Sequence, residues 1–219
     1  MDIPITAERQ AEVRRLLSLT PEEVRQRAAQ HLIVCPNLDA LHRQIAEDIA
    51  AEIEAANAQG TPLRLILPVG PTGGYPHLVR LVVERQLSLA DCWLFFMDEY
   101  CDADGSVLPP AHPLSFRGAI ERLFLAPLRA HGYELPPEQV IFPDQSNYTR
   151  LAALIERLGG IDTCYGGIGI HGHLAFNEPE PGVAALSVRR VRLNAYTITM
   201  NAIRAQIGGN IACFPRERS

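Results

Sequence analysis

The chain has 219 residues, of which 47% are hydrophobic and 21% charged, and its formal net charge is −5. This composition is typical of one large or two small globular domains with an ample core. No apolar stretch is long enough to cross a membrane, and Met1–Glu8 lacks the basic region and apolar core of a signal peptide. We therefore expect a cytoplasmic protein with no membrane partner.

The absence of lysine excludes one class of chemistry. All 20 basic residues are arginine, so neither a lysine Schiff base nor ordinary pyridoxal-phosphate anchoring can form on this chain. The arginines are dispersed, with no basic run beyond Arg189–Arg192, and the net charge is negative, so we expect no nucleic-acid partner. The five cysteines are scattered without a CxxC pair, which argues against a disulfide framework or a zinc site.

The first part of the chain is predicted to be helical. Residues 7–18 and 21–31 are rich in Glu, Arg, Gln and Ala, and Thr20 can cap a helix whose first residue is proline. We predict that residues 1–31 form a helical extension and that residues 32–219 form an α/β domain.

Strands and helices alternate through the α/β domain. Apolar runs bounded by turn residues predict strands, and apolar residues that recur every three or four positions predict helices. The predicted strands are 32–35, 63–69, 92–97, 140–143, 161–165 and 186–193, and the predicted helices are 39–57, 77–85, 116–129, 147–158 and one from about 197.

A glycine-rich turn joins the strand at 63–69 to the next helix. Free backbone amides and a helix amino terminus in this arrangement can bind an anion, and the ligand that this pattern predicts is a phosphate group. A tight connection without a ligand explains the turn equally well. The turn has neither GK[ST] nor GxGxxG, which argues against ATP and NAD. The candidate substrate-binding residues are Gly70, Thr72, Gly73 and Gly74.

Two adjacent acids, Asp98 and Glu99, end the apolar strand at 92–97. A carboxylate beside a buried strand is costly and tends to have a shifted pKa, which is typical of a reactive group. The alternative is that Asp98 caps the following loop or helix while Glu99 is solvated. The strand ends near residues 70, 98 and 169 all carry residues suited to ligand binding or catalysis. Parallel strands bring their carboxyl ends together, which favours a functional site.

The segment 166–179 follows the predicted strand at 161–165 and combines four glycines with His171, His173 and Glu178. The two imidazoles and the carboxylate predict acid and base catalysis. An HxH metal site with Glu178 as a third ligand is the alternative. We favour the acid and base interpretation, and we expect no metal and no cofactor.

Four segments resemble the signatures of glucosamine-6-phosphate deaminases, in that family's order and spacing. They are Pro71–Pro76, Phe96–Tyr100, His112–Phe116 and Gly166–Pro179. The resemblance runs from about residue 32 to the end. The related 6-phosphogluconolactonases share the fold, but the ending Phe176–Pro179 favours the deaminases. The resemblance implies a Rossmann-like α/β fold with an open, mostly parallel sheet and helices on both faces.

The resemblance also implies a reaction, the conversion of an aldose 2-amino-6-phosphate to a ketose phosphate and ammonia. Asp98 matches the base that moves a proton from C2 to C1, and His173 matches the group that opens the sugar ring. Glu178 matches the carboxylate that orients this histidine. The loop Thr72–Gly74 and Arg204 match the phosphate site. Glu99 and Gly169 are further predicted substrate-binding residues.

Two features depart from the family pattern. His171 stands where the family has an aspartate that takes part in ring opening, so this step should be slower, depend on Glu178 alone, or act on another sugar. Family members also continue beyond the region matching Ser219, with a phosphate-binding lysine. The expected partner is a small sugar phosphate, and a homo-oligomer is one option. A sugar-phosphate sensor and a lactonase are the alternative functions.

Overall fold

The computed structural model describes residues 6–169, 172–177, 186–205 and 214–219. Contacts divide the chain into two compact units, Met1–Ala40 and Leu41–Ser219. The predicted extension, residues 1–31, falls within the first unit. Among the described residues, no helix is both long enough and apolar enough to cross a membrane.

The first unit contains the short helices α1 (Ala7–Leu17), α2 (Pro21–Ala28) and η1 (Ala29–His31). Local capping stabilises them: the Thr6 hydroxyl accepts from the Arg9 amide, and Thr20 and Glu23 form a reciprocal capping box. The strand predicted at residues 32–35 is wrong. A strand needs a neighbour to satisfy its backbone groups, and no described strand pairs with this segment.

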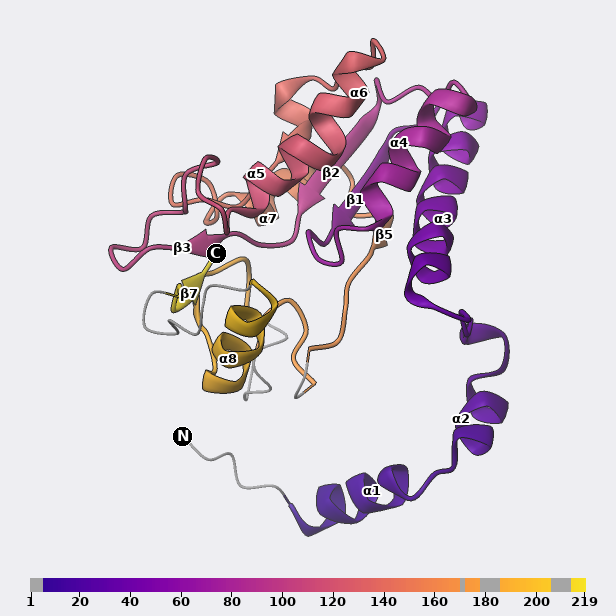
Figure 1. The fold of residues 1–219 in the computed structure, drawn as a ribbon, viewed down its shortest axis with the longest axis vertical. Coiled ribbons are helices and arrows are strands. Elements are labelled where there is room, and N and C mark those ends of the chain that lie inside the picture. The colour runs from indigo at the N-terminus through magenta and orange to yellow at the C-terminus, as the bar shows by residue number, and fades with distance from the viewer. Residues whose placement is uncertain (1–5, 170–171, 178–185, 206–213) are drawn as a thin grey trace. The chain divides into compact units, whose positions relative to one another are not determined.

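The second unit is built on a parallel sheet (Figure 1). Its strands are β1 (Leu63–Leu67), β2 (Cys92–Phe96), β4 (Val140–Ile141) and β5 (Thr163–Cys164), in the order β4-β2-β1-β5. All three pairings are parallel, as predicted. The segments after β1, β2 and β5 therefore leave the sheet at one edge. From β1 the chain adds β2 and then β4 on one side of the sheet, and it later adds β5 on the other side of β1. The strand order therefore reverses between β1 and β5, and open α/β sheets bind ligands at such a switch point.

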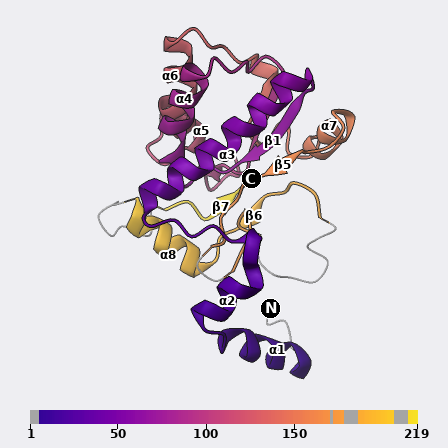
Figure 2. The same cartoon turned by 90° about the vertical axis from the view of Figure 1, so that its right-hand side faces the viewer.

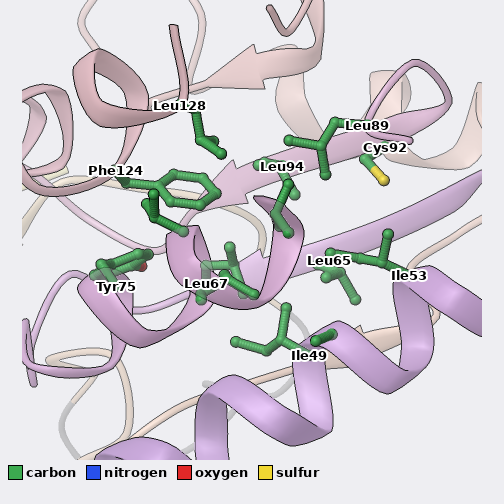
Figure 3. Packing of buried hydrophobic residues seen from close by; sticks show 14 of the residues in the cluster. Ile49, Ile53, Leu65, Leu67, Tyr75, Leu89, Cys92, Leu94, Phe124 and Leu128 are labelled. Carbon is green, nitrogen blue, oxygen red and sulfur yellow. The ribbon is translucent and has the colours of Figure 1, made fainter. Parts of the chain in front are cut away.

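One face of the sheet is covered by helices that follow the predicted ones closely. They are α3 (Leu38–Gln59), α4 (Gly74–Glu84), α5 (Phe116–Ile120), η2 (Glu121–Leu125) and α6 (Ala126–Ala130). Leu65 and Leu67 point from β1 toward Ile49 and Ile53 of α3, and Phe124 packs with Tyr75 on the same side (Figure 3). This layer is the main hydrophobic core.

The other face of the sheet carries α7 (Leu151–Arg157), which lies across the sheet from α3, α4 and α6 (Figure 2). Alternate residues of each strand point to this side. Ile66 of β1 and Phe95 of β2 line a cavity together with Leu151 and Ile155 of α7. Helices therefore cover both faces, as predicted.

A small antiparallel sheet adjoins the edge where β2 ends. Its strands are β3 (Tyr100–Cys101), β6 (Val191–Arg192) and β7 (Glu217–Arg218), in the order β3-β7-β6. With α8 (Ala195–Arg204) it encloses a second apolar cluster around Tyr100, Ile198 and Phe214. The predicted strand 186–193 is shortened to β6, and β7 was not predicted, because Glu-Arg has no apolar alternation. The described residues also include the short helix η3 (Pro137–Gln139).

We expect Leu65→Ala to lower the free energy of unfolding by about 2–5 kcal/mol, because the side chain is fully buried and its removal leaves a cavity. Urea denaturation of the full chain would measure this. The matched control is Ile203→Ala on α8, where the side chain is 63% exposed and the change should stay within about 0.5 kcal/mol. Equal losses in the two variants would contradict this account of the core.

Candidate functional site

Asp98 lies just past β2, at the edge where the parallel strands end. It is only 6% exposed, and it lines a cavity of about 570 Å³ together with Gly172, Leu174 and Arg218. Nη1 of Arg218 donates to Oδ2 of Asp98 at 3.0 Å. Burial raises the pKa of the Asp98 carboxyl, while the nearby guanidinium opposes that rise. The site therefore holds a carboxylate that binds a proton more readily than an exposed aspartate does.

Glu99 is also buried, but it serves α5 rather than the cavity. One carboxylate oxygen accepts from the amides of Tyr100 and Phe116, and the other accepts from the Arg117 amide and the Ser115 hydroxyl. These donors include the free amides of the helix amino terminus. The alternative in which Asp98 caps a helix and Glu99 is solvated is therefore wrong: Glu99 is the buried residue that caps α5, and Asp98 lines the cavity. The described contacts do not support the prediction that Glu99 binds substrate.

His173 is held in place by close packing. Its side chain is 7% exposed, Nδ1 lies 3.4 Å from the Thr197 hydroxyl on α8, and the ring packs against Phe176 with centroids 4.9 Å apart. The imidazole also lies over Gly169, where any Cβ atom would overlap it. Gly169, predicted to bind substrate, therefore leaves room for the histidine.

The turn after β1 leads directly into α4, which begins at Gly74, earlier than the predicted residue 77. Gly70 and Thr72 are exposed, and Gly73 at the N-cap offers no side-chain hydrogen bond to the first turn of the helix. The Tyr75 hydroxyl donates to the Pro68 carbonyl at 2.5 Å, which fixes the turn against β1. Amides at an uncapped helix start of this kind can bind an anion.

Two predicted residues cannot be placed, and a third lies on the surface. His171 and Glu178 lie outside the described residues. Arg204 is exposed in the last turn of α8. The metal alternative depends on His171 and Glu178; within the described part of the chain, no three His, Cys, Asp or Glu side chains gather closely enough to hold a metal ion.

Sequence reasoning missed Arg218. The side chain is fully buried and pairs with Asp98, although 120 residues separate them. No local signal identifies it: every cation in the chain is arginine, so residue type does not mark this one. Its role follows only from the pairing of β7 with β3, which sets Arg218 opposite Tyr100.

Gly169→Ala should displace the His173 ring, because the new methyl group would occupy the space of the imidazole. We expect changed ring signals of His173 in a ¹H–¹³C spectrum, assigned with His173→Gln, and a loss of about 1–3 kcal/mol in the free energy of unfolding. The control is Gly167→Ala, where no atom lies within 4 Å of a built Cβ atom. Unchanged His173 signals in Gly169→Ala would contradict the contact.

Comparison with known proteins agrees with the resemblance to glucosamine-6-phosphate deaminases. No protein-family model matches the chain. A glucosamine-6-phosphate deaminase of Parabacteroides distasonis is 33% identical over 175 residues, covering 76% of this chain and 60% of the relative. One of Caenorhabditis elegans is 30% identical over 192 residues, covering 85% of this chain and 68% of the relative. The chain thus spans about three fifths of the length of the first of these relatives.

A solved structure agrees with the fold. The chain superposes on a monomeric glucosamine-6-phosphate deaminase of the NagB superfamily with a TM-score of 0.69, over 84% of this chain and 72% of that one. The identity is 24%, so this likeness concerns the fold alone. The identity to the curated relatives over most of the chain's length shows that the chain belongs to the glucosamine-6-phosphate deaminase family.

Proposed function

We propose that this protein converts an aldose 2-amino-6-phosphate, with glucosamine 6-phosphate as the first candidate, to a ketose 6-phosphate and ammonia. The observation that carries the proposal is the buried Asp98 carboxylate, which faces a cavity at the carboxyl edge of the parallel sheet. Gly172 and Leu174, on both sides of His173, line the same cavity. Membership of the deaminase family supports the substrate class.

In the proposed reaction, the sugar ring opens first, and His173 exchanges a proton with the ring oxygen. The Asp98 carboxylate then takes the proton from C2 and returns it to C1, which moves the double bond and leaves an imine at C2. Water hydrolyses this imine, so that the ketose phosphate and ammonia are the products. None of these steps forms a covalent bond between the substrate and the enzyme, which agrees with the absence of lysine as a nucleophile.

The phosphate is proposed to bind at the turn Gly70–Gly74, where the start of α4 has no side-chain cap. Arg204 is proposed as a second phosphate contact on the basis of the family pattern. Since Arg204 is exposed on α8, it would have to reach the phosphate from the surface. His171 and Glu178 remain proposed partners of His173.

The decisive assay follows both products from glucosamine 6-phosphate, using a coupled ammonia reaction and detection of fructose 6-phosphate. We expect Asp98→Asn to lower kcat about 10²- to 10⁴-fold, because the amide cannot accept the proton. Asp102→Asn, an exposed aspartate in the following loop, is the matched control and should keep full activity. In D₂O, deuterium should appear at C1 of the product to the extent that the proton on Asp98 exchanges with solvent before it is returned to C1.

A folded sample without turnover on this and related amino-sugar phosphates would contradict the proposal. A rise in melting temperature with glucosamine 6-phosphate but without turnover would instead favour the sugar-phosphate sensor.

Activity should depend on pH through Asp98. The base works only when it is ionised, and burial raises its pKa above that of an exposed aspartate. The rate should therefore fall as the pH is lowered through this raised pKa, at a higher pH than an exposed aspartate would give. A profile of kcat/KM against pH measures this fall in rate on the acid side. A rate that stays constant down to pH 4 would contradict Asp98 as the base.

A further inference from the structure

Among the described residues, Arg218 is the most deeply buried arginine, and the proposed reaction gives it no role. It is 1% exposed and lies on β7, beside the cavity that Asp98 lines. Burying a guanidinium is expensive unless other groups replace its water. The surroundings of Arg218 therefore show what its charge does.

Three aromatic rings take the place of most of that water, although Nε of Arg218 is buried without a hydrogen-bond partner in the described part of the chain. The guanidinium carbon lies 3.6 Å from the ring centroid of Tyr100, 3.6 Å from that of Phe176 and 4.4 Å from that of Phe116. Such contacts stabilise a cation through the negative faces of the rings. They also restrict the plane and position of the guanidinium, because the rings come from three separate segments. Arg218 is held in one place before any ligand arrives.

The guanidinium engages only one side of the Asp98 carboxylate. Nη1 donates to Oδ2, and within the described part of the chain no hydrogen bond reaches Oδ1. Asp98 nevertheless lines the cavity. The pair thus leaves one carboxylate oxygen fixed by a charge and the other available to a ligand in the cavity.

Backbone pairing sets this geometry. Tyr100 pairs with Arg218 in the β3–β7 ladder, and the Glu99 amide donates to the Ser219 carbonyl at 3.1 Å. The strand that carries Arg218 is therefore registered directly on the segment that carries Asp98. A slip of one residue would turn the guanidinium to the opposite face of the small sheet.

We propose that Arg218 is a positioning residue that holds Oδ2 of Asp98, keeps the buried carboxylate ionised, and leaves its other oxygen directed at the cavity. The proposal rests on the proposed function for its catalytic meaning, since it acts through the base of that reaction. Its physical content, an Asp98 that stays ionised because of Arg218, stands on the described contacts.

Arg189 also lines the cavity, but of the cations in the described part of the chain it is Arg218 whose charge acts on the Asp98 carboxyl. Tyr75 approaches from α4 and Tyr100 from β3, and burial raises the pKa of both phenols, so they stay neutral. Glu99 is the adjacent residue, and its carboxylate is turned to the start of α5. Among the described residues, Arg218 provides the charge that opposes protonation of Asp98.

The first test titrates Asp98 itself in the whole chain, without substrate. Carboxyl ¹³C signals from protein labelled at the aspartate carboxyl carbon, assigned with Asp98→Asn, report its ionisation. We expect Asp98 to be ionised at pH 7 in the unsubstituted protein. A protonated Asp98 at pH 7 would overturn the proposal, and this result needs no folded Arg218 variant.

The second test removes the charge. In Arg218→Met, which keeps an unbranched side chain of similar length, the midpoint of the Asp98 titration should move up by about 1–3 pH units, because an opposite charge at this distance shifts a carboxyl by that amount. Arg218→Lys restores the charge and should return the midpoint most of the way. The matched control is Arg216→Met, an exposed arginine on the same segment, which should leave the midpoint unchanged.

Turnover provides an independent readout. The acid limb of the kcat profile should move to higher pH in Arg218→Met by the same amount as the carboxyl titration, whereas a purely structural role would lower the rate equally at every pH. An unmoved titration in a folded Arg218→Met protein would overturn the proposal. If the titration moves but no amino-sugar phosphate turns over, the proposed function fails while the effect of Arg218 on Asp98 is established.

Discussion

The ion pair of Asp98 and Arg218 is the interaction on which the site depends. It joins the end of β2 in the parallel sheet to β7 in the antiparallel sheet, so the two sheets share one buried charge contact. Removing either partner would leave a charge in an apolar environment, which costs more than the pair contributes. The pair is therefore better understood as a constraint on geometry and ionisation than as a source of stability. The aromatic rings around the guanidinium complete that constraint.

A second constraint is the close approach of His173 to Gly169. The glycine-rich segment after β5 brings its imidazole to the same edge as Asp98 because β5 and β2 both run parallel to β1. Apolar side chains buried on one face of the sheet hold the strands in position, and the positions of the strands determine where the loops begin. The chemistry is thus carried by loops, while their starting points are set by the core formed around Leu65 and Ile53.

Much of this was predictable from local patterns. Apolar runs at 63–69 and 92–97 identified the central strands, and the position of Asp98 at a strand end identified the candidate base. Glu99 shows the limit of this reasoning, since an acid at a strand end has the same sequence signature whether it meets a ligand or the start of a helix. Arg218 lay beyond prediction, because its burial arises from a pairing between distant segments and from rings on three of them.

The contrasting surroundings of Asp98 and Glu99 have a consequence for how this segment can vary. The two carboxylates are neighbours in the chain, yet one faces a cavity and the other satisfies the first amides of α5. Selection on activity would act on the first, and selection on folding would act on the second. A chain that abandoned catalysis while keeping its shape could change position 98 only together with position 218, because Arg218 would otherwise lose its buried partner, whereas position 99 would stay under selection for folding. The pattern of drift across these adjacent codons would then record whether a lineage still depends on the reaction.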